Sequence, residues 1–106
     1  MKKINESDMK GKLVRGDLGS VKVFDAIEKG LVAGVRVVRP MSKVPAAPHS
    51  HRERQLIYLI SGKAWVSNGS ETAEMVPGDF AFFDPDEEHY VTTEISEAKL
   101  FEIKYP

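Results

Sequence analysis

Turn-forming residues divide this 106-residue chain into short segments, and this punctuation is what most limits the folds open to it. Between the Gly, Pro, Asn and Asp positions lie short runs rich in β-branched and aromatic residues, with no sustained helical period. Asn68-Gly69 is the dipeptide preferred in two-residue hairpins, and Pro77-Gly78-Asp79 marks a further turn. The pattern predicts consecutive antiparallel hairpins, and therefore an all-β sandwich or barrel.

The runs between these turns give the expected strands. Only the stretch 94–99 is compatible with a helical turn. The segment 40–48 contains three prolines, which cannot donate ladder hydrogen bonds, so we expect an extended and stiff connection there. The expected strands are 12–14, 20–26, 31–39, 54–60, 63–67, 72–76, 80–83, 90–93 and 99–105.

Composition excludes several classes of function. Fifteen basic residues against sixteen acidic ones give a formal charge of −1, so we expect neither a nucleic-acid partner nor a membrane-binding patch. The chain has no cysteine, so any metal must be held by nitrogen and oxygen ligands. No apolar run follows the first lysines and no segment reaches membrane-spanning length. We expect one cytoplasmic domain spanning residues 1–106.

Two of the expected strands, 55–60 and 80–83, are apolar on both faces. A lone antiparallel sandwich normally leaves one face of each strand in contact with water. Either the chain termini pack over the outer face, or a second copy of the chain does. We expect a homodimer that buries Leu56, Tyr58 or Ile60.

The chain has three histidines: His49, His51 and His89. In an extended segment, residues two apart point to the same face, so His49 and His51 are able to offer ring nitrogens to one point. If the strand runs on unbroken, Glu53 and Gln55 share that face, and either is a candidate ligand. An isolated His-x-His is a weak signal, because a lone surface histidine is usually just solvated.

The sequence around these histidines resembles the two motifs of the cupin superfamily over residues 34–93. In the first motif, His-x-His precedes a glutamate and then a glycine; here Gln55 and Gly62 stand at those two places. The second motif, a Pro-Gly-Asp turn, a hydrophobic strand, a further turn and a final histidine, matches VPGDFAFFDPDEEHY, which contains His89. The departures from the family pattern are Gln55, Asp84, Asp86 and Thr93.

This resemblance implies an antiparallel double-stranded β-helix, the jelly-roll or cupin barrel. It also implies one divalent metal ion, Mn, Fe, Ni, Zn or Cu, because those ions suit nitrogen and oxygen ligands. A glutamine ligand brings no charge, so the metal keeps its full +2 and becomes a stronger Lewis acid. Glu53 is the rival to Gln55. The implied metal ligands are His49, His51, Gln55 and His89.

Three histidines with a glutamine make the chain similar to the uronate-linearising cupins of pectin and alginate breakdown. Those proteins carry a carboxylate on the last strand, and Glu102 aligns with it, although Lys104 stands where they have an aromatic residue. Glu102 is a catalytic acid or base if it faces inward. Its alternation with Phe101 and Ile103 favours an outward direction. Arg36 either holds a substrate carboxylate inside or extends outward; we expect the outward direction.

These observations favour a metal-dependent enzyme whose partner is a small-molecule substrate. The expected chemistry is Lewis-acid-assisted isomerisation or ring opening of a small oxygenated compound, a sugar acid or keto acid. One alternative is a metal-dependent dioxygenase, which uses the same ligands with a redox metal and O₂. Another is a non-enzymatic cupin that binds a small molecule or keeps a structural metal.

Overall fold

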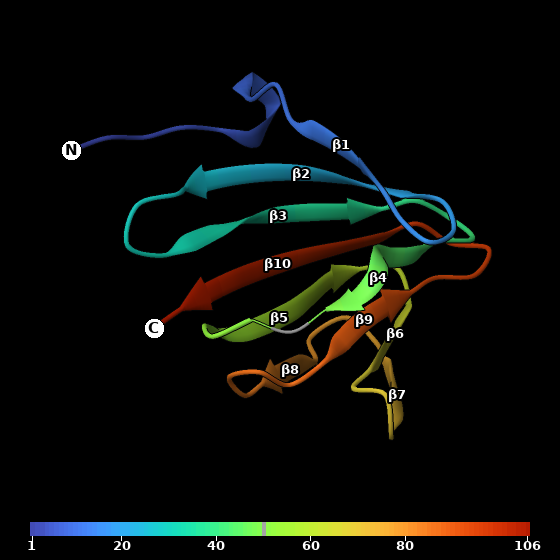
Figure 1. Cartoon of the computed structure of the whole chain (residues 1–106). Helices are drawn as coiled ribbons and strands as arrows, with labels where there is room; N and C mark the ends of the chain where they lie inside the picture. The colour runs from blue at the N-terminus through green and yellow to red at the C-terminus, as the bar shows by residue number, and fades with distance from the viewer. Residues whose placement is uncertain (50) are drawn as a thin grey trace.

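The strands form two antiparallel sheets that pack face to face (Figure 1). The structure, a computed structural model, describes residues 1–49 and 51–106, except for the side chains of Pro48 and His49. A short 3-10 helix, η1, precedes the strands. The elements are η1 Glu6–Asp8, β1 Lys12–Arg15, β2 Ser20–Ile27, β3 Val32–Val38, β4 Lys43–His49, β5 Arg54–Ser61, β6 Ala64–Ser67, β7 Thr72–Met75, β8 Phe80–Phe83, β9 His89–Thr92 and β10 Ala98–Tyr105.

The larger sheet has the strand order β1-β2-β3-β10-β5-β8, and the smaller has the order β4-β9-β6-β7. The last strand, β10, therefore lies between β3 and β5, at the centre of the larger sheet (Figure 1). Strands far apart in sequence become neighbours in this way, as the jelly-roll arrangement requires. The predicted all-β, antiparallel double-stranded β-helix is confirmed.

The core lies between the two sheets. Alternate residues of each central strand point into it, so β5 contributes Ile57 and Leu59 and β10 contributes Leu100, all fully buried. The smaller sheet supplies Val66 and Val91 from the opposite side. Burying apolar side chains from both sheets stabilises the pair of sheets against separation.

One prediction about the backbone was wrong. The proline-rich segment expected to be a connection forms strand β4, Lys43–His49. It lies at the edge of its sheet, where a strand tolerates prolines because one row of its backbone groups needs no partner. The stretch 94–99, compatible by sequence with a helical turn, has no helix in the structure, and β10 begins at Ala98. No helix among the described residues has the length and apolarity needed to cross a membrane.

The outer face of β5 and β8 carries an exposed aromatic cluster. Phe80 and Phe82 are 59% and 66% exposed, and the Tyr58 ring packs on the Phe80 ring with centroids 4.6 Å apart. Ile60 is also exposed, and Leu56 is partly buried. The homodimer expected to bury this face stays a prediction. Sedimentation velocity over a concentration series tests it, and a monomer at every concentration would contradict it.

Candidate functional site

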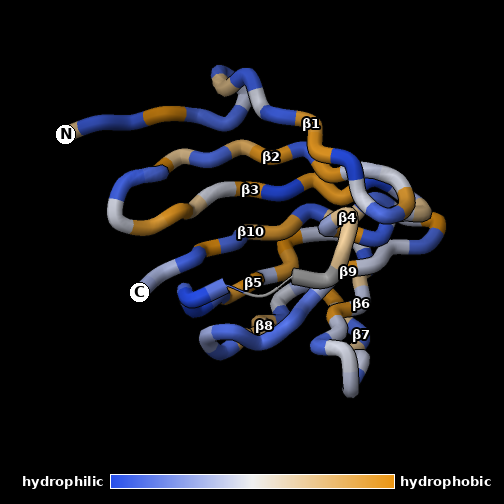
Figure 2. The backbone as a smooth tube through the Cα atoms, in the orientation of Figure 1, coloured by the Kyte–Doolittle hydropathy of each residue, from blue (hydrophilic) through white to orange (hydrophobic). Residues whose placement is uncertain are grey.

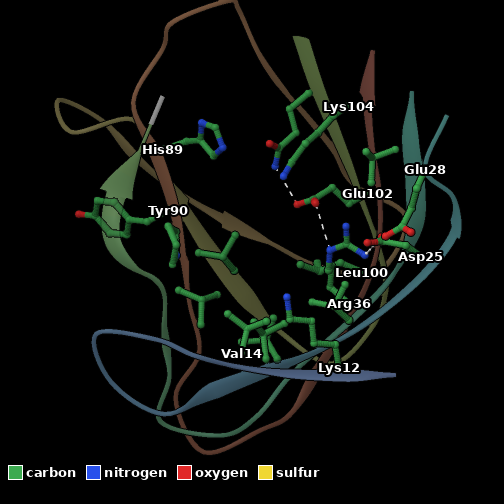
Figure 3. A pocket seen from close by; sticks show the side chains of 18 residues that line it. Lys12, Val14, Asp25, Glu28, Arg36, His89, Tyr90, Leu100, Glu102 and Lys104 are labelled. Carbon is green, nitrogen blue, oxygen red and sulfur yellow. Dashed lines mark hydrogen bonds and ion pairs between the residues drawn. The ribbon is translucent and has the colours of Figure 1, made fainter. Parts of the chain in front are cut away.

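A pocket of about 430 Å³ opens between the two sheets. Valine is the most frequent residue of its lining, and the charged side chains of Arg36, Glu102 and Lys104 also line it (Figure 3). The polar lining comes mainly from five strands of the larger sheet and from β9 of the smaller one. The polar and charged residues of the lining are Lys12, Asp25, Glu28, Arg36, Gln55, His89, Tyr90, Glu102 and Lys104.

His89 begins β9, and its side chain is held in a fixed orientation. Its ring stacks on Phe83, with centroids 4.5 Å apart, and its Nδ1 donates to the Glu87 carbonyl oxygen at 2.9 Å. Since a carbonyl only accepts, Nδ1 carries the hydrogen, and Nε2 has the lone pair of the neutral ring. Burial lowers the pKa of the imidazole, although the hydrogen bond to Glu87 opposes that shift. His89 is therefore neutral at pH 7, the form that binds a metal.

His51 has the same arrangement in the connection that precedes β5. Its Nδ1 donates to the Glu53 carbonyl oxygen at 2.9 Å, so the hydrogen of the neutral ring again lies on Nδ1. The rings of His51 and His89 meet edge to face, with centroids 5.0 Å apart. In both histidines a backbone carbonyl two residues away selects the tautomer that directs the Nε2 lone pair toward a ligand.

Gln55 connects His51 to the interior of the larger sheet. Its amide Nε2 donates to Glu102 Oε1 at 2.8 Å, and its Oε1 lies 2.8 Å from His51 Nε2. The carboxylate of Glu102 fixes which way the amide points, because only the amide nitrogen has hydrogens to donate. Gln55 Oε1 and His51 Nε2 therefore face each other as two electron-pair donors. Two electron-pair donors at this distance repel each other unless a positive charge lies between them. A second proton on His51 supplies that charge, and so does a cation bound by both atoms. The donor set therefore fits a metal ion.

Behind Gln55, an ion-pair network continues across the sheet. Arg36 Nε donates to Glu102 Oε2 at 3.1 Å, and Arg36 Nη1 lies 2.6 Å from Asp25 Oδ1 (Figure 3). The register places Gly34 between Asp25 and Glu102, so no side chain separates the two carboxylates. Arg36 is the charged residue within the otherwise uncharged β3. Figure 2 shows β3 as a largely hydrophobic strand with a hydrophilic interruption. It bridges Asp25 and Glu102.

The expected outward directions of Arg36 and Glu102 were both wrong. Their side chains are 9% and 13% exposed, whereas Phe101, the neighbour of Glu102 along β10, is 36% exposed and on the outer face. Two carboxylates on the inner face compensate the buried guanidinium, and the guanidinium in turn compensates them. The alternation of apolar residues along β10 favoured an outward Glu102. Charge pairing with Arg36 on the neighbouring strand instead places Glu102 on the inner face.

The network also changes the expected charge of the site. Gln55 itself is neutral, but the carboxylate directly behind it belongs to a group of Glu102, Arg36 and Asp25 with a net charge of −1. In the family pattern a glutamate at the ligand position carries the negative charge. Here the charge is on Glu102, which accepts a hydrogen bond from Gln55. A glutamate at position 55 would bring two carboxylates within hydrogen-bonding distance of each other, which like charges disfavour. The neutral amide of Gln55 therefore suits a site in which Glu102 already supplies the carboxylate.

The structure places the candidate ligands as follows. His51, Gln55 and His89 come together at one end of the pocket region, while the side chain of His49 lies outside the described residues. The backbone of His49 ends β4 and pairs with His89. Among the described side chains alone, no three histidines or carboxylates converge on one point.

Glu53 does not share the position of Gln55. The strand expected to run through both histidines is interrupted, since β4 ends at His49 and β5 begins at Arg54. The Glu53 carboxylate is half exposed and lies 4.0 Å from Nδ1 of His51, the nitrogen that carries the hydrogen. Gln55 is therefore the better candidate of the two.

Sequence reasoning missed Asp25 and did not assign a role to Lys104. A single arginine in an apolar strand signals that buried carboxylates must be found elsewhere, and this signal points toward a residue such as Asp25. Lys104 follows Glu102 by two residues and therefore shares its inward face.

Comparison with known proteins places this geometry in a family. The model of the cupin domain matches residues 36–103, more than half of the chain. No curated protein matches the sequence. Several solved structures align with nearly the whole chain, and three of them are described next.

The polyketide cyclase RemF from Streptomyces resistomycificus is 21% identical, with a TM-score of 0.83 over 98% of this chain and 78% of that one. A predicted oxalate decarboxylase from Thermotoga maritima is 16% identical, with a TM-score of 0.87 over 98% of both chains. An RmlC-like cupin from Shewanella frigidimarina is 17% identical, with a TM-score of 0.82 over 100% of this chain and 91% of that one. At these identities the structures establish the shared fold. The chain belongs to the cupin family.

Proposed function

We propose that this cupin is a metal-dependent enzyme that acts on a small oxygenated substrate bound in the pocket. One divalent metal ion is held by His49, His51, Gln55 and His89. The observation that carries the proposal is the contact of His51 Nε2 with Gln55 Oε1 at 2.8 Å, which a metal ion bound by both atoms would balance. Glu102 supports this assignment, because its hydrogen bond fixes the amide in the orientation that turns Oε1 toward His51.

The reaction class follows from the chemistry that such a pocket supplies. A bound divalent metal acts as a Lewis acid toward a carbonyl or hydroxyl oxygen. Glu102 lines the same pocket and offers a carboxylate for accepting or returning a proton. Together these two elements are able to promote isomerisation or ring opening of a sugar acid or keto acid. The similarity to proteins named polyketide cyclase and predicted oxalate decarboxylase supports an enzymatic role and leaves the reaction open.

Metal content is the direct test of this proposal. Protein purified without chelators or nickel resin is expected to contain about one divalent metal per chain by elemental analysis. His51→Ala and Gln55→Ala are expected to lose most of it, because each removes a ligand. Glu53→Ala is the matched control and should keep it, since its half-exposed carboxylate lies on the protonated side of His51.

Two outcomes would contradict the assignment. Folded wild-type protein with no more metal than His51→Ala would exclude the metal centre. Loss of metal in Glu53→Ala, with none lost in Gln55→Ala, would move the oxygen ligand to Glu53. The cytoplasmic location remains a separate prediction, which cell fractionation tests.

A further inference from the structure

We propose that the pocket recognises a carboxylic acid with a hydrocarbon body, and that Lys104 rather than Arg36 holds its carboxylate. The inference rests on the proposed function and narrows its substrate class. Three features of the pocket carry it: the pairing of Arg36 with two carboxylates, the position of Lys104 and the apolar side chains of the lining.

Arg36 is the obvious anion-binding group by charge, but its Nε and Nη1 atoms already contact carboxylates. Asp25 lies 2.6 Å from Nη1, and Glu102 accepts from Nε at 3.1 Å. Arg36 Nη1 also lies within 3.3 Å of the Val35 carbonyl oxygen. A substrate carboxylate at Arg36 would meet two resident carboxylates, and like charges disfavour that approach.

Lys104 supplies the positive charge that Arg36 does not offer. It lies on the inward face of β10, lines the pocket, and is directly opposite Gln55 in the register (Figure 3). Among the described residues, Lys104 forms no ion pair or hydrogen bond with a protein carboxylate. An anion at Lys104 therefore lies beside the candidate metal ligands.

Half of the residues that line the pocket have side chains without hydrogen-bonding atoms. A polyhydroxylated sugar placed against these apolar side chains would leave hydroxyls without partners, which is costly. A hydrocarbon body buries well there. The cavity of about 430 Å³ is in the range of small-molecule sites. These apolar residues are Val14, Val21, Val23, Val32, Val38, Val44, Pro45, Val91 and Leu100.

Together these features orient the substrate. The carboxylate lies at Lys104 and the hydrocarbon body extends over the valines. Because Lys104 is the cross-strand neighbour of Gln55, the carbon next to the carboxylate lies beside the donor set of Gln55, His51 and His89. Of the two substrate classes proposed above, this favours a keto acid with an apolar chain or ring over a sugar acid.

Binding of benzoate, measured by isothermal titration calorimetry, tests the inference. Benzoate is expected to bind wild-type protein at least about tenfold more tightly than benzamide, which lacks the charge, or glucuronate, which lacks the apolar body. Lys104→Met should weaken benzoate binding by about tenfold or more, and Lys104→Arg should retain most of it. Lys22→Met, which removes the same charge from the exposed outer face of β2, should leave binding unchanged.

The titrations are repeated with chelated and with metal-loaded protein. Dependence on Lys104 in the chelated protein supports the inference whatever the outcome for the metal centre. Equal affinity for benzoate and benzamide would overturn the role of the charge, and equal affinity for glucuronate would overturn the apolar body. Weakening in Lys12→Met with no change in Lys104→Met would assign the carboxylate to the other lysine of the pocket.

Discussion

Arg36→Met is expected to lower the free energy of unfolding by about 3 to 5 kcal/mol, which is the usual cost of leaving a buried ion pair without one partner. The change keeps much of the length of the side chain and removes its charge. Asp25 and Glu102, whose side chains are only 17% and 13% exposed, would then remain inside the protein without the cation between them. Urea unfolding followed by circular dichroism measures the loss.

A matched control separates this effect from the general cost of losing an arginine. Arg39→Met removes an arginine whose pair with Glu97 spans 4.0 Å, with both side chains more than half exposed. Surface pairs of this kind contribute about 0 to 1 kcal/mol. The triple variant Arg36→Met, Asp25→Asn, Glu102→Gln should recover much of the stability, because no unpaired charge stays buried. A loss in Arg36→Met no larger than that in Arg39→Met would refute the buried network.

Gln55→Glu is expected to have opposite effects in the absence and presence of metal. Without metal, the new carboxylate replaces an amide that donates to Glu102 at 2.8 Å, so a hydrogen bond becomes a repulsion. We expect a loss of about 1 to 3 kcal/mol in the free energy of unfolding. With metal, the added negative charge strengthens binding, so the increase in melting temperature on loading should exceed that of the wild type.

The exchange variant Gln55→Glu, Glu102→Gln tests whether repulsion between the two carboxylates causes the metal-free loss of stability. It restores a hydrogen bond in which the donor is now on β10, so the metal-free stability should return close to that of the wild type. Thermal unfolding with chelator and with saturating Zn²⁺ or Mn²⁺ supplies both measurements; ligand at one hundred times its Kd stabilises by about 2.7 kcal/mol. Unchanged metal-free stability in Gln55→Glu would show that the amide does not donate to Glu102. If none of the three proteins is stabilised by metal, the proposed centre is wrong.

The pairing of Gln55 with Glu102 also shows the limit of reading a motif by position. The sequence shows a neutral residue where the family has a carboxylate, and this predicted a more positive metal. The structure places Glu102 2.8 Å behind that residue, with Arg36 and Asp25 completing a group of net charge −1. The charge of the site is thus set by four residues from β2, β3, β5 and β10, which a linear motif does not include.

The resemblance to the cupin motifs implied His49, His51, Gln55 and His89 as candidate ligands, whereas the sequence by itself determined the all-β fold and most strand positions. These features depend on local chemistry: turns need particular residues, and strands show their alternation within a few positions. The same local rule failed at residues 40–48, since only the sheet decides that β4 is an edge strand and therefore tolerates its prolines.

Only the tertiary structure decided which face of β10 points inward. Alternation separates Glu102 and Lys104 from Phe101 and Ile103, but it does not say which pair is buried when both faces contact something. The answer came from Asp25 and Arg36, distant in sequence, which compensate the charge of Glu102 across β2, β3 and β10. A buried charge is stable only beside its partner, and strand pairing, rather than sequence separation, brings those partners together.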